Sequence, residues 1–392
     1  MKTRDKRPET VATHAGRDPF AHFGVVNTPV YHASTILAPT VAERRKQKGL
    51  RDPRYGRRGT PTLFTLEDVL AELEGAAGAV ICPSGLNAIT VALLAHVRQG
   101  DHVLMVDCVY GPARRFATHY LTRIGVETTF FDPLIGADIA DLIRDNTRVV
   151  YLETPGSQTF EMQDVPAIAA VARERGATVM IDNTWATPVF FQPFDHGVDV
   201  SIHAATKYIV GHSDAMLGAV TCRDEASFER VRDIWDTFGA APGPDDVYLG
   251  TRGIRTIHVR LRQHQENALA LARWLQERPE VERVLYPALP DDPGHEIWKR
   301  DFTGASGLLG VLLRPCSDAA VESMLDGLEL FGMGASWGGY ESLILPADPR
   351  GMRTATRWEA DGPLLRIHVG LEAVDDLTAD LDAGFERLRA SA

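Results

Sequence analysis

Cysteine is scarce in this chain, and the few cysteines form no recognisable pattern. Among 392 residues there are four, at positions 82, 108, 222 and 316, with no Cys-x-x-Cys pair and no histidines at zinc-site spacing. His295-Glu296 matches the start of a zinc-protease helix, but Lys299 stands where that motif has its second histidine. We therefore expect free thiols and no metal site.

Long apolar runs and an excess of positive charge are also missing. No stretch approaches the ~20 apolar residues that span a bilayer, and residues 1–7 lead into no apolar signal segment. The net charge of -12 disfavours binding to a nucleic-acid backbone. With 44% hydrophobic and 24% charged residues, the composition is that of an ordinary globular protein. The sequence therefore predicts a cytoplasmic protein whose partners are neither membranes nor nucleic acids.

Between about residues 60 and 222, apolar runs alternate with helical patterns, which is typical of a mostly parallel sheet flanked by helices. Strands are expected at 79–82, 102–106, 149–153, 179–182, 200–203 and 219–222. Leucines at 63, 66, 70 and 73 predict one helix before the first strand, closed by Gly75. We therefore expect a large α/β domain.

The rest of the chain predicts an arm and a second, smaller domain. Residues 257–275 carry one apolar helical stripe and predict a long linking helix. After it, strands are expected at 281–285, 308–313 and 364–369, followed by a closing helix over 377–388. Residues 1–54 are polar and interrupted by prolines. The predicted division is an arm at the subunit interface (1–54), a large cofactor-binding domain (55–245), and a linker helix with a small C-terminal domain (246–392).

Two residues that follow apolar runs suit the chemistry of pyridoxal phosphate (PLP). Lys207 follows the predicted strand at 200–203, and Asp182 ends the strand at 179–182. A lysine that carries PLP covalently needs mostly apolar surroundings, which lower its pKa. A carboxylate beside the pyridine nitrogen keeps that nitrogen protonated, so the ring can accept electrons from the substrate Cα. Alone, either residue would suit a surface or a turn, but Thr206 and the Pro83-Ser84-Gly85 turn add two phosphate-binding features.

A family resemblance becomes specific when eight motifs are taken in order. They are Tyr55-Gly56-Arg57-Arg58-Gly59-Thr60, Pro83-Ser84-Gly85, Val109-Tyr110-Gly111-Pro112, Glu153-Thr154-Pro155-Gly156-Ser157, Asp182-Asn183-Thr184-Trp185, Ala205-Thr206-Lys207-Tyr208, Ser336-Trp337-Gly338-Gly339-Tyr340-Glu341-Ser342 and Arg366-Ile367-His368-Val369-Gly370-Leu371-Glu372. From about residue 10 to its end, the chain resembles the cystathionine β-lyase branch of the Cys/Met-metabolism family of PLP-dependent enzymes.

The resemblance implies an architecture and an assembly. The fold is expected to be fold-type I, PLP-dependent transferase-like α/β, with a large, mostly parallel seven-stranded-type sheet domain that has helices on both faces, plus a small C-terminal α/β domain. The assembly implied is a homotetramer of two dimers with shared active sites.

The resemblance also assigns roles to individual residues. Lys207, Tyr110 and Asp182 would be catalytic and would contact the cofactor. The PLP phosphate would be bound by the backbone N–H groups of Gly85 and Leu86 at a helix start, by Thr206, and by Tyr55 and Arg57 from the neighbouring subunit. Arg366, with Ser336 and Trp337, would bind the substrate α-carboxylate. Arg58 would bind its distal carboxylate.

The implied reaction is β-elimination of L-cystathionine to homocysteine, pyruvate and ammonia. The Gly156-Ser157 pair favours β- over γ-elimination, because γ-acting relatives usually show Thr-Asn-Pro there. Two positions depart from the family pattern: Ala204 replaces a phosphate-binding serine, and Arg115 replaces an acid near the distal amine. The alternatives are a lyase for L-cysteine or other cysteine S-conjugates, a γ-lyase or γ-replacement synthase, and a non-catalytic regulatory protein that keeps the fold.

Overall fold

A computed structural model describes residues 6–49 and 51–391; residues 1–5 and 50 of the predicted arm lie outside the described part, as does residue 392. The strands are β1 Gly78–Cys82, β2 His102–Val106, β3 Glu127–Phe131, β4 Thr147–Glu153, β5 Thr178–Asp182, β6 Val200–His203, β7 Gly218–Cys222, β8 Val281–Leu285, β9 Leu308–Leu313, β10 Leu343–Ala347 and β11 Leu364–His368. The α-helices are α1 Pro8–His14, α2 Val41–Lys46, α3 Pro61–Glu74, α4 Gly85–Leu94, α5 Gly111–Arg115, α6 Val165–Glu174, α7 Thr187–Phe190, α8 Glu225–Phe238, α9 Pro244–Ile254, α10 Ile257–Gln276, α11 His295–Asp301, α12 Asp318–Asp326 and α13 Val374–Ala390.

The large sheet has seven strands in the order β1-β7-β6-β5-β4-β2-β3. Strands β3, β2, β4, β5 and β6 run parallel, whereas β7 is antiparallel to both of its neighbours. The parallel strands β2, β5 and β6 are buried almost throughout, which explains their nearly unbroken apolar sequences. Each predicted strand of this region is present, and the predicted architecture is confirmed.

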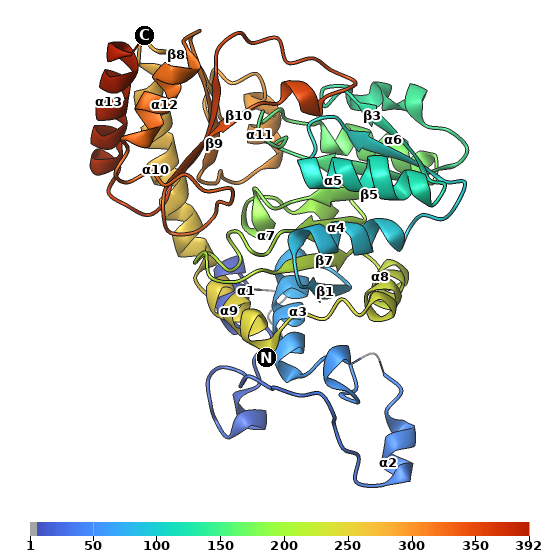
Figure 1. Ribbon diagram of the computed structural model, residues 1–392. Helices are drawn as coiled ribbons and strands as arrows, with labels where there is room; N and C mark the ends of the chain where they lie inside the picture. The colour runs from blue at the N-terminus through green and yellow to red at the C-terminus, as the bar shows by residue number, and fades with distance from the viewer. Residues whose placement is uncertain (1–5, 50, 392) are drawn as a thin grey trace.

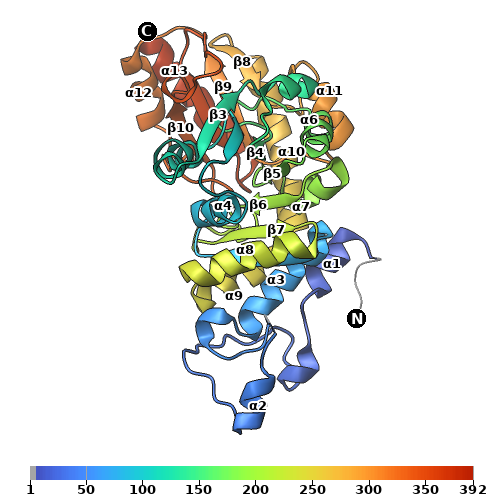
Figure 2. The ribbon, with the colours of Figure 1, turned by 90° about the vertical axis from the view of Figure 1, so that its right-hand side faces the viewer.

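Helices that precede or follow these strands in the sequence pack against the sheet. Helix α3 packs on β1 and, as the leucine spacing predicts, buries Leu66 and Leu70 completely. It ends at Gly75, whose φ of 69° is the left-handed conformation that favours glycine. Helix α4 packs on β6 and β7, and α8 packs on β1 and β7 (Figure 2).

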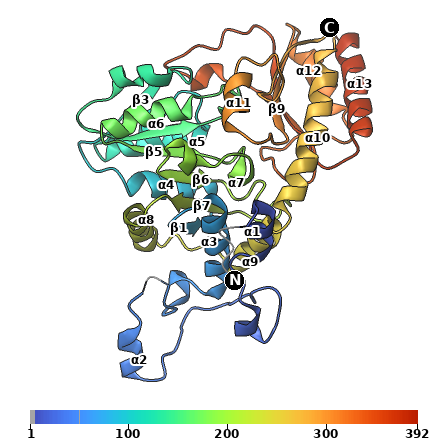
Figure 3. The ribbon, with the colours of Figure 1, turned by 180° about the vertical axis from the view of Figure 1, so that it is seen from behind.

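The small sheet contains four antiparallel strands in the order β10-β11-β9-β8. The long helix α10 leads from α9 to this sheet and packs on β8, β9 and α13 (Figure 3). Two hydrogen bonds tie the sheets together: the indole N–H of Trp185 donates to the Leu308 carbonyl at 2.9 Å, and the Gly307 N–H donates to the Tyr208 hydroxyl at 2.9 Å. The small unit is thus docked beside the segment that carries Lys207.

After α1, which packs on α3, the N-terminal segment projects away from both sheets (Figure 1). It exposes large apolar side chains, including Phe20 (92% exposed) and Leu37 (86% exposed). Scattered apolar side chains are normal on a surface, but a projecting segment of this kind is suited to packing against another chain. Among the helices of residues 6–49 and 51–391, none has both the length and the apolarity needed to cross a bilayer.

Candidate active site

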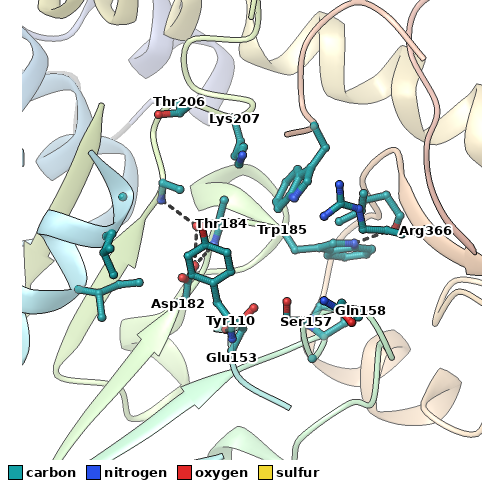
Figure 4. A pocket seen from close by; sticks show the side chains of 18 of the residues that line it. Tyr110, Glu153, Ser157, Gln158, Asp182, Thr184, Trp185, Thr206, Lys207 and Arg366 are labelled. Atoms are coloured by element: carbon teal, nitrogen blue, oxygen red, sulfur yellow. Dashed lines mark hydrogen bonds between the residues drawn. The ribbon is translucent and has the colours of Figure 1, made fainter. Parts of the chain in front are cut away.

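A cavity of about 380 Å³ lies where β4, β5 and β6 end, and the small domain closes one side of it (Figure 4). Its lining includes eight residues predicted from the sequence, seven of which are Gly85, Leu86, Tyr110, Asp182, Thr206, Lys207 and Arg366. The eighth is Trp337. The carboxyl ends of parallel strands meet at one edge of a sheet, which explains why residues far apart in sequence converge here.

Lys207 follows β6 and points into the cavity (Figure 4). Its Nζ donates to the Ser336 hydroxyl at 2.6 Å and lies 5.3 Å from the centre of the Trp337 ring. Burial lowers the pKa of this amine to about 8, and the positive charge of Arg366 acts in the same direction. The amine is therefore far more often neutral, and nucleophilic, than an ordinary lysine at the same pH.

Gly338 makes the close approach of the Ser336 loop possible. Its φ is +86°, and a Cβ at this position would lie 2.9 Å from the Lys207 backbone. No other residue fits there without moving the lysine.

The low pKa of Lys207 predicts a labelling profile in the cofactor-free protein. Because only the neutral amine reacts, trace acylation of Lys207 should rise with pH and reach half its maximum near pH 8, whereas an ordinary lysine has a pKa of 10.5. Peptide mass spectrometry after brief treatment with acetic anhydride would measure it. A midpoint above pH 10 would contradict the assignment of Lys207 to an apolar pocket.

Asp182 and Glu153 are neighbouring carboxyl groups at the floor of the cavity. They end β5 and β4 in direct register, and both line the cavity. Burial raises the pKa of both, and the field of Asp182 raises the pKa of Glu153 further. Asp182 accepts from the backbone N–H of Thr184 at 3.0 Å and from its hydroxyl. These donors, with the positive charges of Lys207 and His203, oppose the rise at Asp182, so the charged form of Asp182 is better stabilised than that of Glu153.

The start of α4 offers backbone N–H groups at another side of the cavity. Gly85 and Leu86 both line it, after Ser84, whose hydroxyl caps the helix by accepting from the Asn87 N–H at 3.1 Å. Residue 85 must be glycine, because a Cβ there would lie 2.5 Å from the Ala204 Cβ. A helix N-terminus with an open cavity in front of it is suited to a phosphate group.

Thr206 lines the same cavity, but its hydroxyl already has two backbone partners. It donates to the Leu217 carbonyl at 3.0 Å and accepts from the Leu217 N–H at 2.9 Å. Its predicted role toward a phosphate therefore stays a prediction and would need the hydroxyl to change partner.

Arg366 and Tyr110 lie at the part of the cavity away from the helix start. Arg366 comes from β11, and its Nη2 donates to the carbonyls of Ala335 (3.1 Å) and Ser336 (3.2 Å). In the part of the chain that the structure describes, no carboxylate pairs with it, so its charge is free to bind an anionic ligand. Tyr110 is fixed through its backbone N–H, which donates to Glu153 Oε2 at 2.7 Å.

Four predicted site residues do not line this cavity: Ser336, whose hydroxyl nevertheless bonds to the Lys207 amine, and three residues from the N-terminal part of the chain. Arg57 pairs with Asp236 of α8, and Arg58 pairs with the same carboxylate at 2.7 Å. Tyr55, half exposed, faces a separate hollow of the N-terminal segment. Within one chain, therefore, these three N-terminal residues are not brought together with Lys207. Arg115, the other departure from the family pattern, is exposed.

Sequence reasoning missed several residues that line the cavity: Glu153, Ser157, Gln158, Thr184, Trp185 and Met216. Most of them stand directly after β4 and β5, so their position at strand ends was the available signal. Gln158 stands out because it has a φ of +67°, which is uncommon for a residue other than glycine and often marks a functional site.

The residues present fit PLP. An anion-binding helix start, a buried carboxylate and a lysine of low pKa open into one cavity, and these match the phosphate, the ring nitrogen and the aldehyde of the cofactor. Arg366 remains free for a substrate carboxylate.

Known proteins match the chain over nearly its whole length. The family described as Cys/Met metabolism PLP-dependent enzyme matches residues 9–386. The cystathionine β-lyase of Escherichia coli K12 is 47% identical, covering 98% of this chain and 99% of that protein. The L-alanine/L-glutamate racemase of Wolbachia pipientis wMel is 42% identical, covering 97% of this chain and 98% of that protein. The solved structure of cystathionine γ-synthase from Xanthomonas oryzae pv. oryzae in complex with cystathionine superposes with a TM-score of 0.91 at 32% identity, covering 99% of this chain and 100% of that one.

Proposed function

Because the chain belongs to the Cys/Met-metabolism family of PLP-dependent enzymes, we propose that it is a carbon–sulfur β-lyase that cleaves L-cystathionine to homocysteine, pyruvate and ammonia. The observation that carries this proposal is the convergence of Lys207, Asp182 and Arg366 on one cavity. The greater identity to a β-lyase than to a γ-synthase supports β- over γ-chemistry. Three free, buried cysteines support a cytoplasmic location.

Four residues of the cavity have a part in this reaction. Bound PLP stabilises negative charge at the substrate Cα, which makes loss of a β-substituent possible. The Lys207 amine removes the Cα proton, holds it on Nζ, and delivers it to the departing sulfur. The Asp182 carboxylate holds a proton on the pyridine nitrogen. Arg366 orients the substrate through its α-carboxylate, and Tyr110 packs beside the leaving group.

The test is to incubate the protein with PLP and L-cystathionine and to identify the oxo acid and the thiol. Pyruvate with homocysteine is expected. 2-Oxobutyrate with cysteine would instead make the protein a γ-lyase. A PLP-loaded protein that leaves cystathionine intact but forms D-alanine from L-alanine would share the activity of its racemase relative.

We further propose that two chains share each active site, within a homotetramer of two dimers. Arg57 supports this: it lies outside the cavity of its own chain, and it follows in sequence the N-terminal segment that projects from the body (Figure 1). In this arrangement Tyr55 and Arg57 of one subunit bind the cofactor phosphate of the other, and Arg58 binds the distal carboxylate of the substrate.

Sharing predicts complementation between inactive variants. Lys207→Ala and Arg57→Ala chains are each expected to be inactive, but a dimer containing one of each has one complete site. Random pairing makes about half of the dimers mixed, so about a quarter of the sites should regain activity. Pyruvate release after joint refolding would measure this. Lys207→Ala with Asp182→Asn is the matched control, because both changes fall in the same chain's part of the site and no recovery is expected. Mixed oligomers without recovery in the first pair would refute sharing.

A further inference from the structure

A segment of the small domain crosses to the large domain beside the active site. Residues 348–360, here called the strap, connect β10 to β11 without regular strand structure, apart from one short turn of helix. Figure 1 shows this orange-red segment leaving the small sheet toward the large domain. A buried carboxylate of the large domain binds three consecutive residues in the middle of the strap.

That carboxylate belongs to Asp107, which directly follows β2 and is completely buried. It accepts from three consecutive backbone N–H groups of the strap, those of Thr354 (3.0 Å), Ala355 (2.9 Å) and Thr356 (2.8 Å). The Thr356 hydroxyl donates as well, at 3.0 Å. Consecutive N–H groups that converge on one anion form a strong binding nest.

The same carboxylate also binds a side chain of α5. Arg114 of α5 pairs with it, and the Arg114 guanidinium lies 3.6 Å from the centre of the Phe130 ring. Burial alone would raise the pKa of Asp107, but the donors of Thr354 and Thr356, with Arg114, lower it. Tyr110 immediately precedes this helix. Asp107 is therefore connected to the backbone of Tyr110 through one turn of α5.

The strap in turn contacts the wall of the cavity. Met352 lies over Gly111, where a Cβ would come within 2.8 Å of its Cε, and its sulfur accepts from Gln158 Nε2 at 3.7 Å. Arg353 pairs with Glu161 at 2.5 Å, in the loop that also carries Ser157 and Gln158. Gln158 lines the cavity in the left-handed conformation described above. The strap thus supports the segment that bounds the cavity beside Tyr110.

We propose that Asp107 is a positioning residue that clamps the strap across the active-site edge, and that it thereby fixes Tyr110 and Gln158 against the part of the substrate that lies beyond the sulfur. The effect on the substrate rests on the proposed β-lyase function. Asp107 itself does not line the cavity, so it acts through α5 and the strap. A substrate with a long leaving group would contact Tyr110 and Gln158 at this wall of the cavity, whereas one with a very small leaving group would not reach them.

The Asp107→Asn variant tests the clamp, because an amide keeps the size of the side chain but presents a donor to groups that all donate. Thr356→Val is a milder second variant that removes one donor and keeps the backbone. Asp348→Asn is the matched control: it removes a carboxylate from the strap itself, one that is exposed and bonds only to Arg350. All variants would be studied as PLP-loaded enzymes.

The first measurement is limited trypsin digestion, which does not depend on activity. The strap carries Arg350, Arg353 and Arg357, and cleavage after them requires the strap to leave its place. We expect Asp107→Asn to be cut in the strap at least about tenfold faster than wild type, because a buried group loses charged hydrogen bonds. Thr356→Val should be cut at an intermediate rate, and Asp348→Asn at the wild-type rate. Unchanged cleavage of Asp107→Asn would overturn the clamp, and if that variant fails to fold, Thr356→Val decides the same question.

The second measurement compares kcat/KM for L-cystathionine and for β-chloro-L-alanine, whose leaving group is a single atom. Misplacement of the wall should lower kcat/KM for cystathionine by about 10- to 100-fold and leave the short substrate nearly unaffected. Equal losses of kcat/KM for both substrates would reduce Asp107 to a structural role and overturn its proposed effect on Tyr110 and Gln158. Failure of the wild type to cleave cystathionine would refute the proposed function alone, since the digestion still decides the clamp.

Discussion

Replacing Lys207 with alanine is expected to lower the turnover of cystathionine by about 10⁴-fold or more, because the amine that we propose removes and holds the Cα proton is lost from the cavity. The amine projects between Ser336 and Trp337, and no other lysine lines the cavity. Pyruvate formation, measured with lactate dehydrogenase, gives the rate. The absorption spectrum of the PLP-treated variant shows whether covalent attachment of the cofactor is lost as well.

Two further substitutions separate chemistry from folding. Lys207→Arg keeps the positive charge near Asp182 but has no amine that can lose its proton at neutral pH, so it should be as inactive as the alanine variant. Lys299→Ala changes an exposed lysine of α11 and should have no effect. Multiple turnovers by Lys207→Ala would show that another group carries the reaction.

Replacing Asp182 with asparagine is expected to lower kcat by about 10²- to 10³-fold, as the loss of a pre-organised charge partner does in other active sites. The amide oxygen can still accept from Thr184, so the change alters the charge and little else. Without the carboxylate the pyridine nitrogen loses its proton, and negative charge at Cα is less stabilised. Single-turnover measurement of Cα–H exchange into deuterated water would show the loss at that step.

Glu153 provides the matched control for Asp182. It ends the neighbouring strand in register with Asp182, but burial and the field of Asp182 raise its pKa and disfavour its charged form. Glu153→Gln replaces an acid whose pKa is raised by burial with a neutral amide of the same shape, and the Tyr110 N–H still has an oxygen to bind. Little loss of kcat is therefore expected. A loss as large as that of Asp182→Asn would mean that the charge lies on Glu153 instead.

The sequence predicts the central strands well because they are buried on both faces. Such strands appear as unbroken apolar runs, and each of those in the large sheet begins and ends within two residues of its predicted position. The two strands that were missed lie at the sheet edges. Strand β3 is partly exposed and contains two threonines, and β10 contains Pro346, which argues against a strand unless the strand lies at an edge.

The site was predictable where its residues follow strands, and less so where it depends on pairing. Asp182 and Lys207 could be placed because each ends or follows an apolar run. That Glu153 lies beside Asp182 follows from the register of β4 against β5, and the register cannot be predicted from the apolar periodicity of the sequence. The clamp at Asp107 joins residues about 250 positions apart in the sequence, through backbone N–H groups that have no sequence signature. The periodicity of one chain also cannot predict which residues a second chain supplies to the site, as proposed for Arg57.

The two sheets contribute different halves of the cavity. The large sheet supplies Lys207 and Asp182, to which the proposed function gives the proton transfers, whereas Trp337 and Arg366 line the cavity from the small domain and would bind the substrate carboxylate. Mutations in the small domain can therefore change which amino acid is accepted while the reactive centre stays intact. This separation makes the fold easy to modify during evolution, and it gives a physical reason why β-lyases, γ-synthases and racemases occur among proteins built on one scaffold.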